Sequence, residues 1–193
     1  MAFSSATRTQ DIESESSPRF FEVTVTNLTR GQQFTPILVA SHRAGIRLFE
    51  LGEPASASLR AIAEEGDVAP LAAELAANPD GLEVTNSGAL LDPGASVSIR
   101  VRTQGNFNGV SIAAMLIPTN DGFFALNGAR ISSNSRSRAF TSVAYDAGSE
   151  RNDELCASIP GPSPESTTLA ISIPPTATGE IRSPESSCDA CTD

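Results

Sequence analysis

Acidic side chains in two segments are the residues of this sequence whose types and spacing could do chemistry. Asp146 and Glu150 lie four residues apart around Gly148, and Asp121 follows an apolar run. Like charges this close together are unfavourable unless a cation or water separates them. Three carboxylates from different loops at one end of a β-sandwich would suit Ca²⁺, a hard cation that takes roughly 6 to 8 oxygen ligands.

The same acids have plainer interpretations. Asn120-Asp121-Gly122 is ordinary turn chemistry, and Glu150, Asp153 and Glu154 could form a solvated acidic edge. One alternative is a hydrolase in which Asp121 and Glu150 act as an acid/base pair, with pKa values pushed apart in a cleft. Another is a purely structural domain without metal. The acids match no EF-hand pattern, so their spacing alone leaves these alternatives open.

Few other residues could carry chemistry. The single histidine, His42, is accompanied by no G-x-S-x-G elbow, P-loop, dinucleotide fingerprint or H-E-x-x-H motif, and we interpret it as structural. Cys188 and Cys191 have C-x-x-C spacing, and with Cys156 they allow at most one internal disulfide. A tetrahedral zinc site would need both Cys156 and His42 as its further ligands. A local disulfide or free thiols is the simpler interpretation.

Charge and hydropathy exclude two classes of partner. The 193 residues include 23 acidic and 13 basic side chains, all of the latter Arg, for a formal net charge of −10. An acidic surface of this size repels phosphate backbones, so we expect no nucleic-acid partner. No apolar run approaches the roughly 20 residues of a membrane span. The beginning of the sequence shows no recognisable secretory signal.

Most of the elements that must position these residues are expected to be strands, because apolar and polar residues alternate or apolar residues run continuously between turn signals. The predicted strands are residues 20–29, 34–41, 96–102, 111–117, 123–126 and 139–145. Residues 54–79 predict two short helices over one end of a sheet, with Ser56 and Asp67 as N-caps and Gly66 as the end of the first. The prediction is an all-β fold with a short helical insertion, arranged as an antiparallel β-sandwich.

Composition divides the chain into three parts. Residues 1–18 are polar and predict a flexible leader, and residues 19–162 carry the sandwich domain. Residues 163–193 are rich in Pro and Ser and predict a tail, with one candidate strand at 169–173.

Several segments, read in order, carry a family resemblance. They are FEVTVTNLT at 21–29, PILVASH at 36–42, FELGEPAS at 49–56, PTNDGFFALNG at 118–128, AYDAGSE at 144–150 and NDELCASIPGP at 152–162. The fourth looks like a Pro-x-x-Asp-x-Phe motif, and the fifth like a Tyr/Trp-Asp-Ala-Gly-Thr-acid motif. Over residues 20–162 the chain resembles the spondin N-terminal domains of F-spondin and mindin type, and in particular their bacterial branch.

The resemblance implies a β-sandwich similar to C2 domains with a Ca²⁺ site at one end. Carried over by motif, the ligands are Asp121, Asp146 and Glu150, the last standing where the animal members commonly have Asp. The resemblance further implies a non-enzymatic module, secreted or at the cell surface. Such a module would serve adhesion or matrix interaction with an extracellular protein or glycan.

Overall fold

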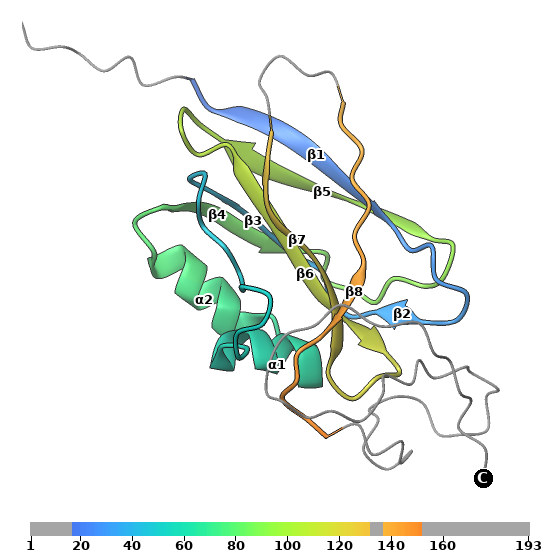
Figure 1. The fold of residues 1–193 in the computed structure, drawn as a ribbon. Helices are drawn as coiled ribbons and strands as arrows, with labels where there is room; N and C mark the ends of the chain where they lie inside the picture. Colours follow the sequence, from blue (N-terminus) through green and yellow to red (C-terminus); the bar gives the residue numbers. More distant parts are fainter. Residues whose placement is uncertain (1–16, 132–136, 152–193) are drawn as a thin grey trace, which may run out of the picture.

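The computed structural model describes residues 17–131 and 137–151. Its elements, in chain order, are β1 (Arg19–Thr26), β2 (Gln33–Phe34), β3 (Leu38–His42), α1 (Ala57–Glu65), α2 (Ala69–Ala77), β4 (Gly81–Asn86), β5 (Ser96–Thr103), β6 (Gly109–Ile117), β7 (Gly122–Arg130) and β8 (Ala144–Asp146) (Figure 1). Every pairing between these strands is antiparallel. The fold class predicted from the sequence, an antiparallel sandwich with a short helical insertion, is confirmed.

Two sheets form the sandwich. β1 pairs with β5 in a two-stranded sheet, and a larger sheet has the order β4-β3-β6-β7-β8 with β2 also pairing with β6. β3 and β6 are buried along almost their whole length, as expected of strands covered on both faces. Successive side chains of a strand point to opposite faces. Accordingly, Leu38 and Ala40 pack toward the helices, whereas Val39 packs toward the β1–β5 sheet.

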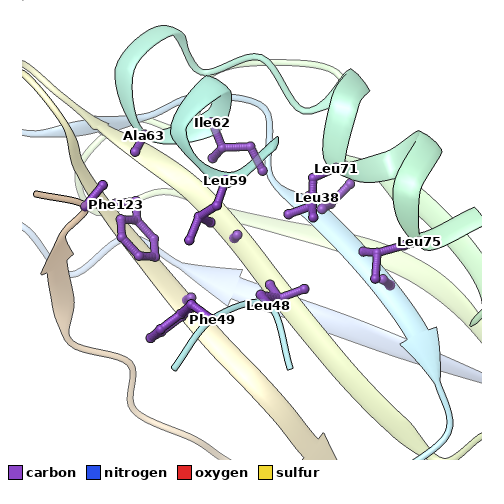
Figure 2. Close-up of a cluster of buried hydrophobic side chains, with 13 residues drawn as sticks. Leu38, Leu48, Phe49, Leu59, Ile62, Ala63, Leu71, Leu75 and Phe123 are labelled. Carbon is purple, nitrogen blue, oxygen red and sulfur yellow. The ribbon is translucent and has the colours of Figure 1, made fainter. Parts of the chain in front are cut away.

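The helices form one wall of the first core. α1 begins after Ser56, whose hydroxyl accepts the Leu59 N–H at 3.2 Å, and ends at Gly66 in the left-handed conformation. Asp67 accepts the Ala69 N–H at 2.9 Å, although Val68 occupies the N-cap position of α2. Figure 2 shows the apolar faces of both helices directed at the sheet and at Phe123. The helices therefore lie along a face of the large sheet, where we had expected them over one end.

The second core lies between the two sheets. Its buried members come from both sheets, from the connection between β2 and β3 and from the loop before β5: Phe34, Ile37, Val39, Leu91, Ile99, Val101, Val110, Ile112, Ala114, Leu116 and Phe124. Alternating residues of β5 and β6 supply most of them, because every second side chain of each strand faces inward. This core keeps β6 and β7 in place, and the loop between those two strands carries one of the candidate acids.

Three elements differ from the sequence prediction. The expected strand at 34–41 is two strands, β2 and β3, separated at Thr35-Pro36-Ile37, where Pro36 has no N–H to give to a ladder. β4 was missed, although Leu82 and Val84 alternate with polar residues there. The expected strand at 139–145 pairs only over Ala144–Asp146. The predicted leader (except residues 17 and 18), the residues after 151, the tail at 163–193 and its candidate strand at 169–173 lie outside the described residues.

Candidate functional site

Pairing of β7 with β8 brings two of the three candidate acids together. Gly122 aligns with Asp146 in the ladder, so Asp121 lies immediately before β7 and Asp146 ends β8 at the same end of the sheet. The backbone N–H of Ala147 donates to the Asp121 carbonyl at 3.2 Å, which continues the alignment by one residue. Asp121 and Asp146 are 25 positions apart in the sequence, and the antiparallel pairing of β7 with β8 brings them close together in space.

Thr119, and not Asp121, supplies the hydrogen bonds of the turn between β6 and β7. The Thr119 hydroxyl donates to the Leu116 carbonyl at 2.6 Å and accepts the Gly122 N–H at 3.0 Å. The peptide bond between Ile117 and Pro118 is cis. The turn is therefore closed by Thr119 and not by the Asp121 carboxylate, which argues against the interpretation of Asp121 as an ordinary turn residue.

The Asp121 carboxylate instead binds a loop almost thirty residues away. Its Oδ2 accepts the backbone N–H groups of Ser149 at 2.9 Å and Glu150 at 3.1 Å, and it accepts the Ser149 hydroxyl at 3.3 Å. Asp121 is fully buried, with 0% of its surface exposed. Its Oδ1 is also buried and has no hydrogen-bond partner among the described residues. One carboxylate oxygen thus binds Ser149 and Glu150, while the other has no partner within residues 17–131 and 137–151.

Three aromatic side chains pack against one another next to the two acids. Phe123 and Tyr145 form the next pair along the ladder, with ring centroids 5.5 Å apart, and Phe49 packs against both of them at 5.4 and 5.0 Å. Burying a carboxylate beside such groups disfavours its charged form. This burial raises the pKa of Asp121 above its ordinary value, and the neighbouring Asp146 carboxylate raises this pKa further, against the lowering effect of the Glu150 and Ser149 N–H groups.

Asp146 is organised by its own loop. Its Oδ1 accepts the Gly148 N–H at 2.6 Å, the short-range Asx hydrogen bond that Asp makes at turns. The side chain retains only 6% of its exposure. Two carboxylates, both nearly excluded from water, therefore face the same small region between the 118–121 turn and the 147–150 loop.

Glu150 enters this arrangement through its backbone. Its N–H binds Asp121, and its side chain is half-buried. Within residues 17–131 and 137–151, no group of three Asp, Glu, His or Cys side chains is close enough together to hold a metal ion. The structure thus brings Asp121 and Asp146 together and places the Glu150 backbone beside them. Among the described residues, the Glu150 carboxylate does not complete a group of three ligands with the two aspartates. Asp153, Glu154 and the three cysteines lie outside the described residues.

His42 is part of a buried network that sequence reasoning did not find. Its Nδ1–H donates to the Arg43 carbonyl at 2.8 Å, so its Nε2 accepts the Ser111 hydroxyl at 2.8 Å. Ser111 Oγ also accepts the Gly128 N–H at 2.8 Å. A serine and a histidine at this distance resemble a nucleophile and its base, but His42 and Ser111 are 0% and 1% exposed. A substrate could not reach them, and the interpretation of His42 as structural agrees with this geometry.

Comparison with known proteins places the whole arrangement in a family. None of the curated protein sequences searched matches this chain. The family model of the spondin N-terminal domain (Spondin_N) matches residues 16–164, a span that includes both sheets, the helices and the acidic loops. The chain belongs to the spondin N-terminal domain family.

Proposed function

We propose that this chain is a non-enzymatic Ca²⁺-binding module that serves adhesion or matrix interaction outside the cell. Spondin N-terminal domains are in general extracellular and non-enzymatic. No helix in the described part of the chain is long and apolar enough to cross a membrane.

The observation that carries the proposal is the Oδ1 of Asp121, which is buried and has no hydrogen-bond partner in the part of the chain that the structure describes. Burying a carboxylate oxygen without a hydrogen bond is costly, and here a second carboxylate, Asp146, adds repulsion. A bound divalent cation would offset both costs, since it supplies positive charge at the point where the two acids meet. Ca²⁺ suits this donor set better than Zn²⁺, because the donors are oxygens.

Asp121, Asp146 and Glu150 are the side chains that would hold the ion. Asp121 and Asp146 lie at the same end of the large sheet, and the Glu150 N–H binds the Asp121 carboxylate, which supports this choice of ligands. Backbone carbonyls and water would complete the coordination, as is usual for Ca²⁺. Bound calcium would join the 118–121 turn to the 147–150 loop and give this end of the sandwich a fixed shape.

Thermal unfolding in EDTA and then in millimolar CaCl₂ tests the site. A ligand that binds only the native state stabilises it by about 2.7 kcal/mol at one hundred times its Kd. For a chain of this size that corresponds to a rise in Tm of roughly 5 to 11 °C. We expect this rise in the wild type and its loss in Asp146→Asn. The matched control is Asp67→Asn, which removes the same charge from an exposed acid and keeps a side-chain oxygen for Ala69.

A second variant separates a metal site from a structural acid. Asp121→Asn keeps an oxygen for the 149–150 N–H groups and removes the repulsion from Asp146. We expect it to melt in EDTA no lower than the wild type and to lose the calcium response. If no calcium-dependent shift occurs in the wild type, the domain is metal-free and the proposal is wrong. Turnover of a glycoside or ester substrate that disappears in Asp121→Asn would support the hydrolase alternative instead.

A further inference from the structure

We infer that the end of the large sheet opposite the acidic loops binds a polysaccharide bearing carboxylate or sulfate groups. We call this surface the arginine end and define it as Arg43, Arg47, Arg130 and Arg138. The inference gives the proposed adhesion module a partner class and rests on that proposal only for its extracellular setting. The surface itself is separated from Asp121 by the length of β7.

Strand register brings these arginines to one end. His42 aligns with Gly109 across the β3–β6 ladder, and Gly109 aligns with Arg130 across the β6–β7 ladder. Arg43 follows His42 directly. The Cα atoms of Arg43 and Arg130 are therefore about two strand spacings, or roughly 10 Å, apart. Gly122 and Arg130 are the two ends of β7 (Figure 1), separated by about 25 Å at a rise of roughly 3.3 Å per residue.

The other two arginines contact the same strand end. Arg138 Nη1 donates to the Arg130 carbonyl at 3.2 Å, and Arg47 Nη1 donates to the Asn127 carbonyl at 2.5 Å. Arg47 is also close enough to His42 for its charge to act on the imidazole. Two segments that are distant in the sequence, the loop after β3 and the chain at and after the end of β7, thus bring these arginines to the same end of the sheet.

Three of these four guanidinium groups have no carboxylate partner among the described residues. Among the described residues, no carboxylate lies within ion-pair distance of Arg47, Arg130 or Arg138, and only Arg43 has such a partner, Asp80, at 3.0 Å. Aromatic rings support two of them: Arg43 lies 4.6 Å from the ring centroid of Phe107, and Arg138 lies 5.3 Å from that of Phe140. Arg43, Arg47, Arg130 and Arg138 are all exposed.

An exposed cluster of this kind attracts an anionic ligand. The planar guanidinium donates two parallel hydrogen bonds to a carboxylate, phosphate or other oxyanion, and every basic residue of the chain is Arg. The overall charge of −10 opposes every polyanion, so binding depends on this local cluster of arginines. We favour a polysaccharide over a nucleic acid because spondin N-terminal domains are in general extracellular. Linear polysaccharides that carry carboxylate or sulfate groups on their sugar rings supply the oxyanions that guanidinium groups bind.

Binding of the full chain to immobilised heparin, hyaluronan and neutral dextran tests the inference. Heparin presents sulfate groups and hyaluronan only carboxylates, so the two arms distinguish the sources of negative charge. In EDTA we expect binding to at least one of them, none to dextran, and weakening as NaCl screens the charges. The double variant Arg130→Gln/Arg138→Gln should bind about tenfold more weakly, as the loss of two exposed ion pairs predicts.

The matched control is Arg30→Gln/Arg60→Gln, which removes two exposed arginines elsewhere and changes the net charge equally. It should bind like the wild type. Equal weakening by both double variants, no binding to either polyanion, or tighter binding to duplex DNA would each overturn the inference. If Arg130→Gln/Arg138→Gln melts at a lower temperature than the wild type, the single variant Arg130→Gln is measured in its place, because the Arg130 side chain is exposed. It should also bind the polyanion more weakly than the wild type.

Failure of the calcium site and failure of this surface give different results. A domain without a calcium-dependent Tm shift that still binds the polyanion in EDTA would refute the metal proposal alone. A domain with that shift and no polyanion binding would refute the arginine end alone.

Discussion

Replacing Asn27 by Asp tests whether a buried amide holds the loops at the acidic end of the sandwich. Asn27 is fully buried, and its Nδ2 donates to the carbonyls of Gln32 at 2.7 Å and Leu91 at 3.0 Å. Its Oδ1 accepts the Thr29 N–H at 3.0 Å and the Thr29 hydroxyl at 2.7 Å. One side chain thereby ties the β1–β2 loop to the segment before β5. Aspartate has nearly the same shape but no amide donor.

The size of the effect follows from these four contacts. A carboxylate at position 27 would keep the two bonds from Thr29 and would turn its second oxygen toward two carbonyl oxygens. The variant can avoid this only by staying protonated, which at pH 7 costs about 4 kcal/mol for a group with an unfolded pKa near 3.9. A protonated Asp can donate to one of the two carbonyls, so a further ~1 kcal/mol is lost. We expect the free energy of unfolding to fall by about 4–5 kcal/mol at pH 7.

The dependence on pH identifies the mechanism. The folded state of Asn27→Asp would raise the pKa of the new carboxyl group, so the folded state binds more protons than the unfolded one. Stability relative to the wild type is then lost as pH rises from about 3.9 toward the raised pKa, by up to about 1.4 kcal/mol per pH unit. At pH 4 the difference should shrink to about 1–2 kcal/mol.

Urea denaturation of the wild type and the variant at pH 4, 5.5 and 7 measures these differences. Asn86→Asp is the control, because Asn86 is exposed and its side-chain oxygen, which Asp retains, accepts the Gly88 N–H at 2.8 Å. It should change stability by no more than about 0.5 kcal/mol at any pH. A difference for Asn27→Asp that stays the same from pH 4 to pH 7 would refute the assignment of the Asn27 Nδ2 as the donor to both carbonyls.

Two further predictions concern other parts of the fold. Burial lowers the pKa of His42 below its ordinary 6.5, so the unfolded state takes up a proton first and the free energy of unfolding falls as pH drops below about 6.5. Denaturant titrations between pH 7 and 5 should show a steeper loss for the wild type than for His42→Gln, and equal slopes would contradict the burial argument. Gly66→Ala should cost about 2–3 kcal/mol, since Gly66 has φ +69° and a Cβ there would lie 2.5 Å from Thr35 Cγ2. Gly88→Ala, with φ +72° and no atom within 4 Å of the added Cβ, should cost only about 1 kcal/mol in the same urea titration. A larger cost for Gly88→Ala than for Gly66→Ala would show that contact with Thr35 is unimportant.

Local patterns in the sequence predicted much of the fold. The alternation in β1 and β5, the continuous apolar run of β6, the Ser56 cap and the Gly66 end of α1 each depend on residues that are close in the chain. The two strand predictions that were wrong also concern residues that are close in the chain. Pro36 divides an apolar run that looked like one strand, and the short alternation in β4 was overlooked beside the end of α2.

The candidate site shows the same division. The sequence alone led to Asp121 and Asp146, because each lies in a family motif beside a strand, but it could not tell which acid is buried or which oxygen lacks a partner. Those properties depend on the β7–β8 register and on Phe49, which packs from another part of the chain.

The longest-range features were invisible in the sequence. Ser111 binds His42 across 69 positions, and Arg47 reaches Asn127 across 80. No periodicity reports such contacts, since they exist only once β3, β6 and β7 lie side by side. Residue types and short spacings therefore specified the elements and named the acids. Only the pairing of distant strands buried the two aspartates and gave the arginines their common surface.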